Sequence, residues 1–127
     1  MKFRVFLLLP LILSAFTLGG CAKPEGANNG TDVAFVKKHC SELLNKKVRL
    51  TVVYEGWNCP PSCKHPGLSR SDSCVKDNTG CIYLASTGGL NPIGDKGKRF
   101  RIEAVVKRAP NGVCYLKVLK VERVKRP

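Results

Sequence analysis

The sequence RSDSCVKDNTGCIYL, residues 70–84, decides the fold of this chain. Its centre, Asp77-Asn78-Thr79-Gly80, has the composition of a tight turn, because Asp and Asn side chains bond to nearby backbone and Gly adopts a positive φ. The residues on either side predict two short strands, at about 72–76 and 81–86, with alternate side chains on opposite faces. This stretch therefore predicts a β-hairpin around which the rest of the chain is arranged.

Three further strands are predicted from alternating apolar and polar residues. The clearest spans residues 47–57, and two more span residues 100–107 and 113–123. Asn111-Gly112 lies between the last two and is a strong signal for a hairpin turn. In the last strand Leu116 and Val118 fall out of phase with Leu119 and Val121, so we expect a β-bulge near Val118.

One short helix is expected before the first strand. Thr31 or Asp32 can cap its start, and an apolar stripe containing Cys40 follows at helical spacing until about Asn45. Residues 58–69 and 87–98 are rich in Pro or Gly and are predicted to be irregular loops.

The order and spacing of these elements resemble an OB-fold. Residues 46–124 are also similar to small uncharacterised exported OB-fold proteins of bacteria, through RSD…DNTGCIYL, GKRFRIEAVV and GVCYLKVLKVERV. Taken with the expected helix and the cysteine count, these elements predict an all-β domain at residues 31–124, with one short N-terminal helix and a small five-stranded OB-like barrel held together by disulfide bonds. Another small barrel of five or six strands is the alternative architecture. One departure is that the helix precedes strand one, whereas an OB-fold usually has a helix between strands three and four.

The N-terminus has the pattern of an export signal. Lys2 and Arg4 precede an apolar run at residues 5–18, which ends in Leu-Gly-Gly-Cys. This ending resembles the bacterial lipobox, which implies a signal peptide at 1–20, acyl chains such as palmitate on Cys21, and a flexible tether at 21–30. The membrane would then be one partner, through the lipid, and the protein would lie in the cell envelope. No aspartate follows Cys21, so the resemblance favours the outer membrane, facing the periplasm or the surface, over the inner one.

The cysteine count indicates a disulfide framework. Seven cysteines are present, and an even number remains when Cys21 is set aside. The expected disulfide cysteines are Cys40, Cys59, Cys63, Cys74, Cys81 and Cys114. A bond between Cys74 and Cys81 is disfavoured, because a two-residue turn places Cys74 opposite Tyr83 and Cys81 opposite Lys76. The other pairings stay open.

A metal-binding or thiol-redox protein is the alternative hypothesis. Cys59, Cys63 and His65 could act as zinc ligands, with Cys74 or Cys81 completing a tetrahedron. The spacing between Cys59 and Cys63 is one residue longer than in thioredoxin-like pairs, and a structural disulfide is the favoured interpretation.

No catalytic pattern is found in the sequence. The two histidines have no Ser/His/Asp arrangement around them, and no phosphate-binding glycine loop is present. We therefore predict a protein that is not an enzyme and that needs no cofactor.

Positive charge is the main functional signal. The formal net charge is +13, and residues 96–126 contain eleven basic residues against two acidic ones. Such a surface favours an anionic envelope polymer or an acidic protein as partner, and nucleic acid by analogy with OB-folds only. A solvated basic face without a ligand is the alternative. The residues predicted to contact a ligand are Trp57, Arg101, Lys107, Tyr115, Lys117, Lys120 and Arg123. The short basic tail is residues 125–127.

Overall fold

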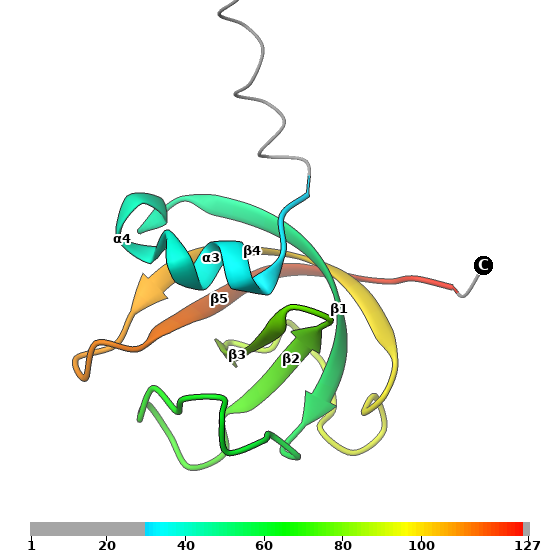
Figure 1. Ribbon diagram of the computed structural model, residues 1–127. Coiled ribbons are helices and arrows are strands. Elements are labelled where there is room, and N and C mark those ends of the chain that lie inside the picture. The colour runs from blue at the N-terminus through cyan, green and yellow to red at the C-terminus, as the bar shows by residue number, and fades with distance from the viewer. Residues whose placement is uncertain (1–29, 126–127) are drawn as a thin grey trace, which may run out of the picture.

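A computed structural model describes residues 30–125, which form a closed five-stranded barrel (Figure 1). The strands lie in the order β1-β2-β3-β5-β4, with β4 pairing back to β1. Among the five pairs of neighbouring strands in the described barrel, β3–β5 is parallel and the other four are antiparallel. The strands are β1 (Lys47–Gly56), β2 (Ser73–Asp77), β3 (Gly80–Ala85), β4 (Arg99–Arg108) and β5 (Cys114–Arg123). This architecture confirms the predicted OB-like barrel.

The β2–β3 hairpin has the register that its turn residues predicted. Asp77 pairs with Gly80, Lys76 with Cys81, and Cys74 with Tyr83. The Asp77 carboxylate closes the turn, accepting from the backbone N–H groups of Thr79 at 2.8 Å and Gly80 at 3.2 Å. A local side-chain bond therefore fixes the register of both strands.

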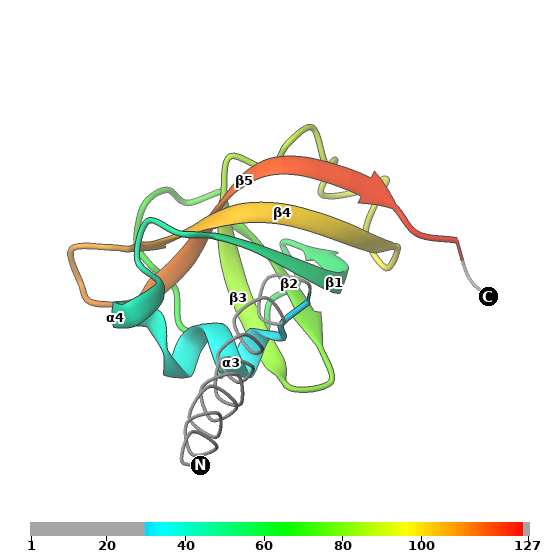
Figure 2. The same ribbon diagram turned by 90° about the horizontal axis from the view of Figure 1, so that it is seen from above.

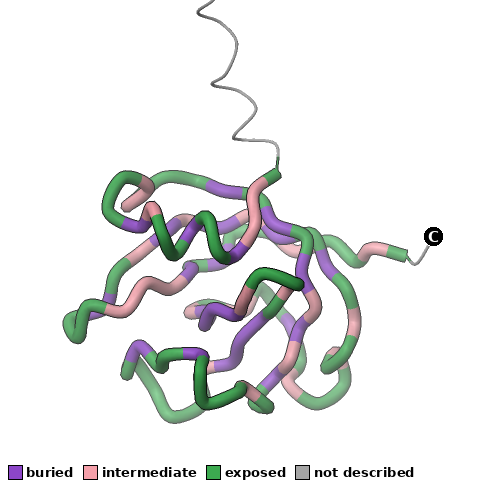
Figure 3. The backbone as a smooth tube through the Cα atoms, viewed as in Figure 1, coloured by how far each residue is buried: buried purple, intermediate pink, exposed green. Residues whose placement is uncertain are grey.

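The core lies inside the barrel and follows the alternation along the strands (Figure 3). On β1 the inward side chains Leu50, Val52 and Tyr54 are buried, while their outward neighbours are more exposed. The side chain of Tyr54 is fully buried, and burial raises the pKa of its hydroxyl. The barrel interior is therefore filled by β-branched, aliphatic and aromatic side chains.

A β-bulge in β5 restores the alternation on that strand. Glu103 of β4 pairs with Lys120 and the next residue, Ala104, pairs with Val118, so Leu119 has no partner on β4. Val118 is buried and Val121 packs on the core, whereas Leu119 is 50% exposed. The expected bulge near Val118 is confirmed, and it turns one leucine outward.

The expected N-terminal helix is present but broken at His39. It forms α3 (Val33–Lys38) and α4 (Cys40–Leu43), and Asp32 caps α3 by accepting from the Phe35 N–H at 2.8 Å. Figure 2 shows α3 beside β3 and β2, and its buried valines join the barrel core. Within residues 30–125, no helix is long and apolar enough to cross a membrane.

Several sequence predictions fall outside the described residues. These are the signal peptide, the lipidated Cys21, the tether up to residue 29, and residues 126–127 of the basic tail.

Candidate anion-binding cleft

Three disulfide bonds join segments that are far apart in the sequence. Their Cα–Cα distances are 6.3 Å, 6.1 Å and 5.6 Å, in the order Cys40–Cys114, Cys59–Cys74 and Cys63–Cys81. The first fastens α4 to β5, and the other two fasten the β1–β2 loop to β2 and β3. Cys74 and Cys81 each bond elsewhere, as the hairpin register predicted.

The β1–β2 loop, residues 57–72, covers the outer side of the β2–β3 hairpin. Cys63, Cys74, Cys81 and Tyr83 form a small buried cluster there, and Tyr115 packs against its edge. OB-folds that bind oligonucleotides use the strand 2–3 face and the loops beside it. In this protein the β1–β2 loop covers that face.

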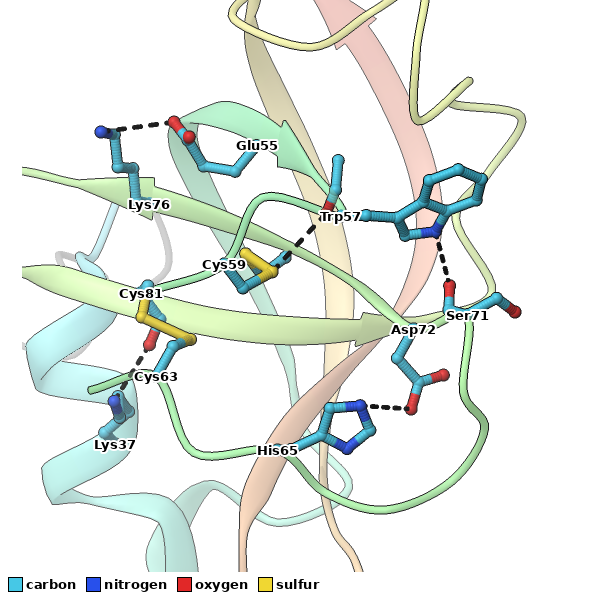
Figure 4. The surroundings of a disulfide bond; sticks show 12 residues. Lys37, Glu55, Trp57, Cys59, Cys63, His65, Ser71, Asp72, Lys76 and Cys81 are labelled. Atoms are coloured by element: carbon cyan, nitrogen blue, oxygen red, sulfur yellow. Dashed lines mark hydrogen bonds and ion pairs between the residues drawn. A yellow bond between two sulfur atoms is a disulfide. The ribbon is translucent and has the colours of Figure 1, made fainter. Parts of the chain in front are cut away.

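His65 is held in place by contacts with Gly67, Asp72 and Tyr83 (Figure 4). Its Nδ1 accepts from the Gly67 N–H at 2.9 Å, its ring centroid lies 4.6 Å from that of Tyr83, and its Nε2 lies 3.9 Å from an Asp72 oxygen. A sulfur in a disulfide is not a thiolate, so Cys59 and Cys63 cannot join His65 as zinc ligands in this oxidised state. Across residues 30–125, no three His, Cys, Asp or Glu side chains are placed to hold a metal ion together.

A cleft of about 570 Å³ lies between the helices, the β1–β2 loop and the β4–β5 turn. Four basic residues line it, and none of its lining residues is Asp or Glu. All four are exposed to solvent. They are Lys37, Lys38, Lys64 and Arg108. The side chains that line the cleft therefore carry a formal charge of +4, a balance of the kind that favours anionic ligands.

Two disulfides place these cations. Lys37 and Lys38 end α3 just before Cys40, and Lys64 directly follows Cys63. Because Cys40 bonds to β5 and Cys63 bonds to β3, three segments converge on one cleft.

The cations differ in how firmly they are held. The Lys37 Nζ donates to the Cys81 carbonyl at 3.0 Å (Figure 4), and an Arg108 guanidinium N–H donates to the Ser41 hydroxyl. Among the described residues, Lys38 and Lys64 have no ion-pair partner. Two cations are thus pre-positioned, and two are free to approach a ligand.

Most of the sequence-predicted ligand residues lie on a different surface. Lys107, Lys117 and Lys120 point outward from β4 and β5, as does Arg101, which lies 3.5 Å from a Glu122 oxygen. Arg123 is exposed near the end of β5 and pairs with Phe100. They are spread along the length of β4 and β5, and none of them lines the cleft.

The two aromatic residues predicted to help bind a ligand lie at different places. Trp57 follows the end of β1, beside Pro92 and Ile93, and its indole N–H donates to the Ser71 carbonyl at 3.0 Å. Tyr115 pairs with Lys107. Trp57 lines a hollow with Pro92 and Ile93, whereas Tyr115 packs against the cluster of Cys63, Cys74, Cys81 and Tyr83. The structure does not assemble them into one stacking surface.

Sequence reasoning missed all four cations of the cleft. Their only signal was position, since the three lysines lie next to or within three residues of a cysteine. That signal has no meaning until the disulfide pairing is known.

Comparisons with protein-family models and with curated proteins returned no match for this chain. Its function is therefore inferred from the chemistry and geometry of these residues.

Proposed function

We propose that this protein is a non-enzymatic binding module of the cell envelope that holds an anionic polymer in the cleft. The observation that carries this proposal is the presence of four basic side chains and no carboxylate among the residues that line it. Each cation can neutralise one anionic group of a ligand, with release of bound counterions.

The shape of the site favours a polymer over an acidic folded protein. The cations come from α3, the β1–β2 loop and the end of β4, on separate walls of a concave site. A flexible chain with repeated anionic groups can enter such a cleft and contact several walls, whereas a flat protein surface cannot. Nucleic acid is one polymer of this class, supported by fold analogy alone.

The envelope location rests on the N-terminal sequence. A lipid on Cys21 would anchor the protein in the membrane, with the outer membrane favoured, and residues 21–30 would tether the domain. In this arrangement the polymer would be a component that meets the protein at the membrane surface.

Heparin, a sulfated polysaccharide, is a suitable probe for this proposal. We expect the double variant Lys38→Gln/Lys64→Gln to bind heparin more weakly and with less salt dependence. At the per-contact coefficients of nucleic acids, loss of two ionic contacts lowers the slope of log K against log[salt] by about 1.4 to 1.8. Isothermal titration at several salt concentrations measures both quantities.

The double variant Lys117→Gln/Lys120→Gln is the matched control. It removes the same charge from the outside of the barrel, so its binding should stay closer to that of the wild type. If the two variants weaken heparin binding equally, the effect comes from net charge, and the cleft is not the site.

A further inference from the structure

We propose that a second surface of the protein, the outside of strands β1, β4 and β5, docks on an anionic lipid bilayer. This outer face is defined by the outward-pointing residues of the three strands. Its basic residues are Lys47, Arg49, Arg99, Arg101, Lys107, Lys117 and Lys120, and its acidic residues are Glu55, Glu103 and Glu122. None of these residues lines the cleft, so the two sites are separate.

The outer face has an excess of positive charge. Seven basic side chains against three acidic ones leave a net charge of +4 on three adjacent strands. Lys47 and Arg49 share Glu103, at 3.5 Å and 3.7 Å. Among the described residues, Lys117 and Lys120 have no ion-pair partner. Anionic headgroups attract such exposed lysines within about one Debye length.

The β5 bulge adds an apolar group to this face. It leaves Leu119 without a partner on β4 and 50% exposed, between Lys117 and Lys120 in the chain. Bulges redirect side chains in this way, and a leucine flanked by lysines suits the boundary between headgroups and acyl chains.

The N-terminal segment joins the domain at this face. The Thr31 N–H donates to the Arg49 carbonyl at 3.2 Å, and Gly30 and Thr31 line a hollow together with Arg49 and Arg101. Figure 1 shows this end of the described chain beside β1. This step rests on the proposed lipid at Cys21, and a ten-residue flexible linker from that lipid would have a root-mean-square reach of roughly 17 Å. A bilayer that held the lipid would lie within reach of the outer face.

Lysine acetylation of the full chain in vesicles tests the docking. The chain is reconstituted in phosphatidylglycerol-rich vesicles and, separately, in neutral phosphatidylcholine vesicles, and the rates are read by peptide mass spectrometry. We expect Lys47, Lys117 and Lys120 to react about fivefold more slowly in the anionic vesicles, and about 0.5 M NaCl to remove the difference. Lys38 and Lys64 in the cleft should change by less than about twofold, which would show that the slower reaction is confined to the docked face.

Two variants sharpen the test. Lys117→Gln/Lys120→Gln should abolish the protection of Lys47, whereas Lys38→Gln/Lys64→Gln should preserve it. Equal acetylation of the outer-face lysines in both kinds of vesicle would overturn the proposal. Protection confined to Lys38 and Lys64 would also overturn it, because the bilayer would then contact the cleft. Heparin binding is measured without vesicles, so failure of the docking leaves the proposed function standing.

Discussion

Asp77 connects the hairpin turn to the N-terminal helix. One carboxylate oxygen accepts from the Thr79 and Gly80 N–H groups, and the other accepts from the Val33 N–H at 3.0 Å. Val33 opens α3, where backbone N–H groups have no partner within the helix. One side chain therefore fixes a turn and satisfies a helix start 44 residues away.

We predict that Asp77→Ala lowers the free energy of unfolding by about 2 to 4 kcal/mol, because it removes several hydrogen bonds to a charged acceptor. Asp77→Asn keeps one acceptor oxygen and should cost less. Urea unfolding followed by circular dichroism measures both losses. Asp72→Ala is the control, since the Asp72 carboxylate accepts one backbone bond, from Ser69, within its own loop. A loss at Asp77 no larger than at Asp72 would contradict this role.

At the scale of elements, the disulfides determine which loops and helices meet. In the chain-entropy description, a crosslink stabilises more when it closes a longer loop. Cys40–Cys114 spans 74 residues and also joins two walls of the cleft, whereas Cys59–Cys74 spans 15 residues and does not line it.

We therefore predict different results from removing these two disulfides. Cys40→Ala/Cys114→Ala should lose about 4 kcal/mol of unfolding free energy, and Cys59→Ala/Cys74→Ala about 3 kcal/mol. Only removal of the Cys40–Cys114 bond should also weaken heparin binding, because α4 and β5 would no longer be covalently joined at the cleft. Urea unfolding and isothermal titration measure the two effects. Equal loss of heparin affinity in both variants would contradict a specific role of the Cys40–Cys114 bond in shaping the cleft.

The position of the helix is a second feature at this scale. The helical segment precedes β1, and the connection between β3 and β4, residues 86–98, is a loop. Asn91 organises this loop, because its side-chain oxygen accepts from the Ile93 and Gly94 N–H groups at 2.8 Å. The barrel therefore closes without the helix that OB-folds usually have at this point.

Over the whole molecule, stability and binding are linked through charge. The sequence has 22 basic and 9 acidic residues, so the folded chain repels itself at low salt. A ligand that binds only the folded state stabilises it, by about 2.7 kcal/mol when present at 100 times its Kd.

We predict that Lys38→Gln/Lys64→Gln changes two thermal quantities in opposite directions. The ligand-free Tm should stay equal or rise, because repulsion within the cleft is relieved. The rise in Tm on adding heparin should shrink, because binding is weaker. Differential scanning calorimetry with and without heparin measures both. A lower ligand-free Tm with an unchanged heparin effect would indicate that the lysines are structural.

Local signals were sufficient to predict the elements of this fold. Turn chemistry at Asp77-Asn78-Thr79-Gly80 gave the hairpin register, and the loss of phase after Val118 gave the bulge. The break at His39 was not predicted, because the apolar stripe continues through it to Cys40 and Leu43. Whether a helix is interrupted at one residue depends on packing against the barrel as well as on the spacing of apolar residues.

The sequence by itself determined the strands, their inward faces, the hairpin register and the exclusion of a Cys74–Cys81 bond. These follow from interactions between near neighbours, whose geometry the backbone fixes. The tertiary structure alone decided the disulfide partners, the covered β2–β3 face and the convergence of four cations on one cleft. Those features depend on which distant segments meet when the barrel closes, and six cysteines allow 15 pairings that sequence spacing cannot distinguish.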